Sequence, residues 1–152
     1  MSAEAREYPR GAWHGESRVV ALNNALAGGG ITYEFGGEWV YQVEAVCLTL
    51  TTAAGGGARF VTVLLIDSTG AVVYAVSAPN TQGGGLTVRY SFAPFVTAFG
   101  SASLGAMGAP FPSIDLPGNV SLQVGVASAE AGDAITDGRL IVKQRWPRDW
   151  RG

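Results

Sequence analysis

The sequence contains few charged residues for its length of 152 residues. Asp, Glu, Lys and Arg make up 14% of the chain, against about 25% in an average globular protein, and the formal net charge is −2. A chain without an excess of basic residues has no positive field with which to hold nucleic acid or an anionic membrane surface. We therefore expect neither as a partner. Low charge also weakens the repulsion between copies, so we expect association with itself or with another protein.

Cysteine and histidine occur once each, as Cys47 and His14. A single cysteine cannot form an internal disulfide, and one Cys with one His cannot build a zinc cluster. Cys47 alternates with apolar neighbours and is expected to be a small buried hydrophobic side chain. His14 lies in a polar segment and is expected at the surface. The sequence therefore predicts no metal and no cofactor.

Long apolar runs are also absent. No uncharged segment approaches the ~18 residues that are needed to span a bilayer. The first seven residues, Met-Ser-Ala-Glu-Ala-Arg-Glu, lack the apolar region of a signal peptide. The sequence leaves the compartment open, and its single cysteine favours synthesis in a reducing cytosol.

No arrangement of residues typical of an enzyme stands out. The segment around Asp67 is similar to the Asp-Thr-Gly of aspartic proteases, but it has an extra residue and no second copy, so a hairpin turn is favoured. Asp133 and Asp137 lack enough oxygen ligands nearby for a calcium loop, and an exposed turn is favoured there. No Gly-Lys-Ser/Thr phosphate loop follows any of the three glycine triplets, at 28–30, 55–57 and 83–85. We expect no catalytic residues and no enzymatic activity.

Short runs of strand character dominate the rest of the chain. They are rich in β-branched and aromatic residues, and glycine or proline separates them. The eight runs cover residues 17–22, 31–35, 39–52, 59–66, 71–76, 86–92, 119–126 and 138–146. No helical period extends beyond a turn or two, and the one candidate for a short helix is the segment 95–103. We expect the segment 130–137 to form a loop. The pattern predicts an all-β sandwich or barrel, and of these we expect an antiparallel sandwich, jelly-roll-like, with seven or eight strands.

The longest run changes its phase in the middle. Alternate residues from Trp39 to Ala45 share one face, whereas the apolar set after that point is Val46, Leu48 and Leu50. A period of two that changes phase indicates an extra residue, so a β-bulge is predicted near Ala45–Val46.

Both ends of the chain are predicted to be extensions of the sandwich. We expect an N-terminal arm over 1–16, a β-sandwich domain over 17–146 and a C-terminal tail over 147–152. The ends carry three of the four tryptophans, and Trp and Arg are enriched at interface hot spots. The predicted protein-interface residues are Trp13, Trp146, Trp150 and Arg151 near the ends, with Tyr41 and Tyr90 on apolar strand faces. We expect a homo-oligomer, with a trimer as the first choice.

The order of several short motifs over residues 39–146 resembles that of small β-sandwich structural proteins of tailed bacteriophage virions. The motifs are Arg59–Asp67 followed by a Gly turn, Pro79, Tyr90-Ser91, Leu116-Pro117-Gly118, the strand Leu122–Val126, Ala131-Gly132-Asp133 and the closing strand to Trp146. The resemblance implies a virion protein that is made in the host cytoplasm, most simply a capsid decoration, cement or minor capsid protein that binds the major capsid protein. It also fits a head–tail connector, collar or fibre component.

A second class of function stays open from the residues themselves. A β-sandwich of this size is also typical of carbohydrate-binding or receptor-binding modules. A sugar site would need exposed aromatic rings beside Asp, Asn or Gln side chains, whereas a structural protein would bury its aromatic residues between subunits.

Overall fold

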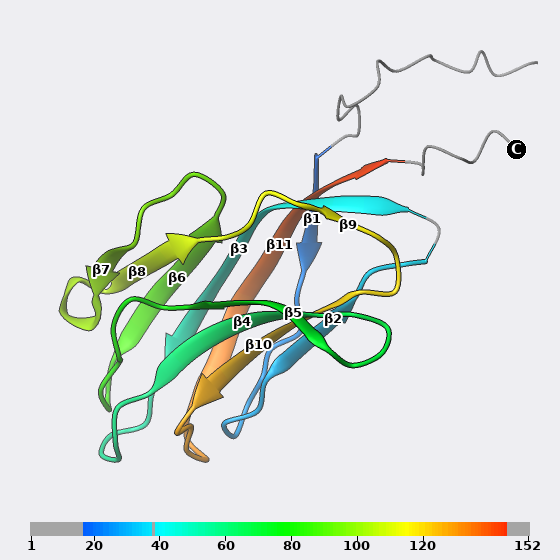
Figure 1. Ribbon diagram of the computed structural model, residues 1–152. Coiled ribbons are helices and arrows are strands. Elements are labelled where there is room, and N and C mark those ends of the chain that lie inside the picture. The colour runs from blue at the N-terminus through cyan, green and yellow to red at the C-terminus, as the bar shows by residue number, and fades with distance from the viewer. Residues whose placement is uncertain (1–16, 38, 146–152) are drawn as a thin grey trace, which may run out of the picture.

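The computed structural model describes residues 17–37 and 39–145, and its regular structure is almost entirely β (Figure 1). Apart from one 3₁₀ turn at Ala102–Leu104, the described elements are strands. They are β1 (Ser17–Ala21), β2 (Ile31–Glu34), β3 (Val40–Thr51), β4 (Phe60–Ile66), β5 (Val72–Ser77), β6 (Thr87–Ala93), β7 (Phe99–Ser101), β8 (Ala106–Pro110), β9 (Asp115–Leu116), β10 (Ser121–Ala127) and β11 (Ala134–Arg145). No helix among the described residues has the length and apolar character required to cross a membrane.

The strands form two sheets that pack face to face (Figure 1). One sheet has the order β1-β11-β3-β6-β8-β7, with β9 also paired to β3, and the other has the order β2-β10-β4-β5. When β7, β8 and β9 are set aside, the remaining strands pair first with last, as β1 with β11, β2 with β10, β3 with β6 and β4 with β5. These pairs alternate between the sheets, as in a long hairpin rolled up on itself. This connectivity is that of a jelly roll, so the predicted fold class is confirmed.

Each of the eight predicted runs corresponds to a strand, and the differences lie mainly between residues 95 and 116. That segment adds three short strands, so the described part of the sandwich has more than the predicted seven or eight. The predicted helix over 95–103 is wrong, because β7 takes up Phe99–Ser101 and only the 3₁₀ turn at Ala102–Leu104 overlaps the end of the segment. After β7 the chain turns back, so β8 runs parallel to β6 and the sheet is not purely antiparallel.

The bulge predicted in the longest strand is confirmed about one residue earlier. Ile141 pairs with Ala45 and Val142 pairs with Val43, which leaves Glu44 as the extra residue of β3. The buried positions change phase at Glu44. Tyr41 and Val43 are buried before it, and every second residue from Val46 to Leu50 is buried after it. A second register shift lies in β11 between Thr136 and Arg139. Because β11 already begins at Ala134, the loop predicted over 130–137 ends earlier than expected.

The hydrophobic core lies between the two sheets and includes two tyrosines that the sequence placed at an interface. Tyr41 and Tyr90 are only 5% and 1% exposed, so the prediction that they form a protein interface is wrong. The ring of Tyr41 packs 4.9 Å from that of Phe35 between centroids. The hydroxyl of Tyr90 donates a hydrogen bond to Gln82 Oε1 at 2.9 Å, and burial raises the pKa of Tyr90 to about 12. Aromatic area and a satisfied polar tip both favour the interior for these rings.

The described chain begins and ends on neighbouring strands. Ser17 at the start of β1 pairs with Lys143 near the end of β11, at one end of the sandwich (Figure 1). The described strands span 17–145, within the predicted sandwich domain of 17–146. The other predicted interface residues, Trp13, Trp146, Trp150 and Arg151, lie outside the described residues, as does His14.

Candidate functional site

Arg59 and Asp133 form a buried ion pair at the end of the sandwich opposite the described chain ends. Arg59 Nε lies 2.9 Å from Asp133 Oδ2 and Arg59 Nη2 lies 3.0 Å from Asp133 Oδ1, so the contact is bidentate. Both side chains are almost completely buried. Such a pair is stable in the interior only when the other polar atoms of both groups are hydrogen-bonded as well.

The remaining hydrogen bonds of the pair come from the glycine-rich loops. Arg59 Nη1 donates to the carbonyl oxygens of Gly55 at 2.9 Å and Gly57 at 2.7 Å. The Asp133 carboxylate accepts from the backbone N–H of Ala53 and of Glu130, each at 2.9 Å. Hydrogen bonds from Arg59 lower the pKa of Asp133 to about 2. The exposed turn predicted at Asp133 is therefore wrong, and its carboxylate is occupied by donors of the chain itself.

Gln82 connects this ion pair to the core. Its backbone N–H and carbonyl pair with those of Arg59 at 2.9 and 2.8 Å, and its side-chain Nε2 donates to the carbonyl oxygens of Leu50 and Leu86. Its Oε1 accepts from Tyr90, so this network joins three loops to strands β3 and β6. Sequence reasoning missed both Arg59 and Gln82 because their partners are distant in sequence. The one local signal was that Arg59, a charged residue, directly precedes the apolar run of β4.

The turn predicted at Asp67 is confirmed as the hairpin between β4 and β5. Asp67 Oδ1 accepts hydrogen bonds from the backbone N–H and the hydroxyl of Thr69 and from the N–H of Ala71. These bonds, that of the Thr69 side chain first, lower the pKa of Asp67. Gly70 takes the left-handed conformation with φ of 87°, as the turn requires. Within 17–37 and 39–145, no group of three or more His, Cys, Asp or Glu side chains lies close enough to hold a metal ion.

Cys47 lies on the outer face of its sheet and is half-buried, so the prediction of a buried Cys47 is wrong. The bulge at Glu44 turns Val46 inward and thus Cys47 outward. There Cys47 contributes to a shallow hollow of about 400 Å³ that is also lined by Arg89, Asp137 and Arg139. This hollow is polar and contains no exposed aromatic ring.

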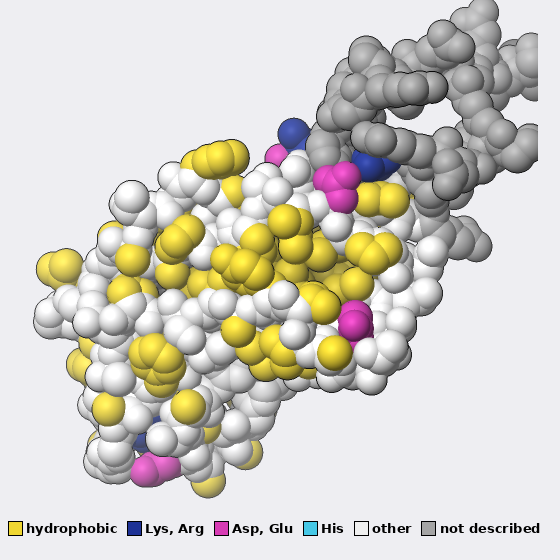
Figure 2. All heavy atoms as spheres, in the orientation of Figure 1, with side chains coloured by type: hydrophobic (Ala, Val, Ile, Leu, Met, Phe, Trp, Pro, Cys, Tyr) yellow, Lys and Arg dark blue, Asp and Glu magenta, His cyan; other side chains and the backbone are white. Residues whose placement is uncertain are grey.

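The β5 strand is an exposed apolar edge of the smaller sheet. Its residues Val72, Val73 and Tyr74 are between 41% and 55% exposed, and the strand carries no charged side chain. The ring of Tyr74 lies 6.4 Å from that of Phe111, which follows β8 in the other sheet. Figure 2 shows hydrophobic side chains gathered on the side of the molecule that carries β5 and the segment linking β8 to β9.

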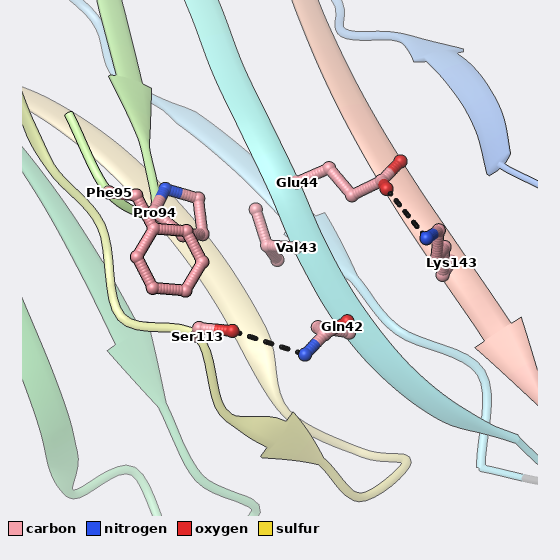
Figure 3. Close-up of a pocket in the computed structure, with 7 residues that line it drawn as sticks. All are labelled: Gln42, Val43, Glu44, Pro94, Phe95, Ser113 and Lys143. Carbon is pink, nitrogen blue, oxygen red and sulfur yellow. Dashed lines mark hydrogen bonds and ion pairs between the residues drawn. The ribbon is translucent and has the colours of Figure 1, made fainter. Parts of the chain in front are cut away.

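A second surface feature is a hollow of about 280 Å³ on the outer face of the larger sheet (Figure 3). Its lining residues come from β3, from β11 and from the loops after β6 and β8: Gln42, Val43, Glu44, Pro94, Phe95, Ser113 and Lys143. Gln42 Nε2 donates to Ser113 Oγ at 3.2 Å, and Lys143 Nζ lies 3.3 Å from Glu44 Oε1. Figure 3 shows the Phe95 ring on one side of the hollow and the Glu44–Lys143 pair on the other.

The sequence matches no known family model and no curated protein. Several solved virus-particle structures show weak structural similarity to the chain. The T13 particle of infectious bursal disease virus matches at 13% identity with a TM-score of 0.41, covering 86% of this chain and 31% of that chain. The structure of the Gt strain of that virus matches at 13% identity with a TM-score of 0.40, covering 90% and 34%. The VP2 subviral particle matches at 14% identity with a TM-score of 0.38, covering 91% and 34%.

The present chain thus spans about a third of the length of the virus-particle chains that it matches.

Proposed function

We propose that the protein is a non-enzymatic structural component of a virion, located in the particle after synthesis in the host cytoplasm. Its partners are further copies of itself and other virion proteins, the major capsid protein first. The jelly roll supports this proposal by analogy, because it is a common architecture of capsid proteins, although the same fold also serves other functions. The order of motifs over 39–146 favours a tailed-bacteriophage particle and a decoration, cement or minor capsid protein in it. A head–tail connector, collar or fibre component is the alternative.

The observation that carries the proposal is the exposed β5 edge. An edge strand presents unpaired backbone N–H and carbonyl groups, and proteins usually protect it with charge, proline or short length. Among the described edge strands, β1 carries Arg18, β2 carries Glu34 and β7 is short, whereas β5 is six residues long and has no charged side chain. A surface of this kind is suited to be covered by another protein chain.

Self-association through β5 is tested by light scattering at micromolar concentration. We expect a homo-oligomer, and Val73→Lys should shift the mass to that of the monomer because it places a charge in the contact. Val19→Lys is the matched control, since it adds the same charge to an exposed position of edge strand β1. A trimer remains the expected size, and a dimer would mean that two β5 edges pair. A monomeric wild-type protein would contradict self-association.

The ends of the chain are proposed as a second docking element, with Trp13, Trp146, Trp150 and Arg151 as contacts. Deletion of residues 147–152 should leave the melting temperature nearly unchanged and abolish binding to the particle. A sharp fall in melting temperature would show instead that the tail belongs to the sandwich, and docking by the tail would then be wrong.

Virion location is tested by mass spectrometry of gradient-purified particles. We expect peptides of this protein in the particle fraction in constant ratio to the major capsid protein. Its presence in the lysate together with its absence from purified particles would refute the virion role.

A further inference from the structure

We propose that the hollow beside Phe95 binds a single pyranose ring of a glycan. The inference is independent of the virion proposal, because it rests on the residues of this hollow alone. A sugar ring offers an apolar C–H face and a rim of hydroxyl groups, so its site needs an exposed aromatic surface next to hydrogen-bonding side chains. The hollow provides both within about 280 Å³.

Phe95 is the aromatic surface of this site. Its side chain is 97% exposed, and its backbone has a φ of 63°, in the left-handed region that bulky residues rarely adopt. A strained backbone that holds a large apolar ring in water contributes nothing to the stability of the folded chain, and strain of this kind concentrates at binding sites. The adjoining Pro94, whose φ is fixed by its own ring, also lines the hollow. The backbone that carries the ring is therefore restricted before any ligand arrives.

The opposite side of the hollow supplies the polar groups. Gln42 and Lys143 are paired residues of the neighbouring strands β3 and β11, and Glu44 is the bulge residue of β3. Glu44 Oε2 also accepts from Ser17 Oγ at 2.7 Å, which orients the carboxylate. After these internal bonds, the Gln42 carbonyl oxygen, further N–H groups of Lys143 and carboxylate lone pairs remain for ligand hydroxyls. Polar groups on rigid elements next to one aromatic ring match the general composition of small-ligand sites.

The size and charge of the hollow narrow the ligand class. Its volume lies just below the roughly 300–1,000 Å³ of pockets for drug-sized ligands, which favours one sugar ring over a longer buried chain. Glu44 and Lys143 form an ion pair, so the hollow carries no net charge that would favour an anion such as phosphate. The hollow around Cys47 has charged residues but no exposed aromatic ring, and it lacks the apolar half of a sugar site.

The test titrates the full chain by NMR with the methyl glycosides of a hexose, an N-acetylhexosamine and a uronic acid. For the strongest ligand we expect a dissociation constant on the order of 1 mM, because the site is shallow and holds one ring. Phe95→Ala should weaken binding at least about tenfold because it removes the stacking surface. Phe95→Tyr should keep binding, because it retains the ring.

Phe99→Ala is the matched control. Phe99 is also an exposed phenylalanine, but it lies on β7 and does not line the hollow, so this variant should bind like the wild type. Because Phe95 is almost fully exposed, Phe95→Ala should leave the melting temperature unchanged, which separates lost binding from lost folding. The absence of chemical-shift changes with every glycoside at concentrations well above that dissociation constant, or equal binding by wild type and Phe95→Ala, would overturn the proposal. It would also be overturned if Phe95→Ala altered only the mass measured by light scattering, since the hollow would then be a protein contact.

Discussion

Asp133→Ala should be among the most destabilising single substitutions in this protein. The substitution removes the partner of a completely buried Arg59 and leaves the N–H groups of Ala53 and Glu130 without their acceptor. Breaking a buried pair in this way costs about 3–5 kcal/mol, because the buried charge loses its hydrogen-bonded partner. That is a large fraction of the roughly 5–15 kcal/mol by which domains are stable.

Urea unfolding followed by tryptophan fluorescence measures this loss. With a slope of about 2 kcal/mol per molar urea, a loss of 3–5 kcal/mol lowers the midpoint by roughly 1.5–2.5 M. Glu130→Gln is the control, because its carboxylate lies 3.7 Å from Arg59 Nη2 and is about half exposed. An exposed pair contributes about 0–1 kcal/mol, so the control should shift the midpoint by at most about 0.5 M.

A further variant tests the cause of the destabilisation. If the orphaned charge is responsible, Asp133→Ala combined with Arg59→Met should be more stable than Asp133→Ala alone. The reasoning would be refuted if Asp133→Ala shifted the midpoint no more than Glu130→Gln, or if the combined variant lost stability beyond the single one.

Four further outcomes follow from the structure. The folded-state pKa of Asp133 is about 2, below the value of about 3.9 in an unfolded chain. The stabilising contribution of this carboxylate is therefore complete above pH ~4 and is lost as the pH falls through 2. Urea midpoints across this range should fall less steeply in Asp133→Ala than in wild type. Gly84→Ala should lower the free energy of unfolding in urea by about 1–3 kcal/mol, because the added Cβ would meet backbone carbonyl oxygens of the facing loop. Gly57→Ala should leave it nearly unchanged, because the Cβ added there would meet no other atom. Leu122→Ala in the core should cost about 2–5 kcal/mol in the same assay, and a smaller loss would mean that the sheets close over the cavity. Cys47→Ser on the outer face should change stability by no more than about 0.5 kcal/mol, and a larger loss would restore the buried position predicted from sequence.

The residues that form the candidate sites could not be recognised from the sequence alone. Phe95 was visible in the sequence as one aromatic residue among several, and nothing local distinguished it from the buried Tyr90 or Phe92. The polar residues that share its hollow come from positions 42, 44, 113 and 143. The β5 edge could be predicted as a strand, but its position at the edge of a sheet depends on the order of all strands.

The sequence alone determined the properties that depend on neighbouring residues. Alternation of apolar side chains marked the eight jelly-roll strands, and Asp67 with Gly70 marked a hairpin. The change of phase in the longest run predicted a bulge near Ala45–Val46, about one residue from its position at Glu44. These signals are local, since the period of a strand and the geometry of a turn are set within a few residues.

Only the tertiary structure decided which side chains meet across the fold. Arg59 and Asp133 are 74 residues apart, and they form a pair because rolling the sheets brings the ends of β3, β4, β10 and β11 together. The same packing turned Tyr41 and Tyr90 inward and left Phe95 in water. Burial is a property of the whole assembly of strands, because a strand with apolar residues on both faces has two possible inner faces until its neighbours are in place.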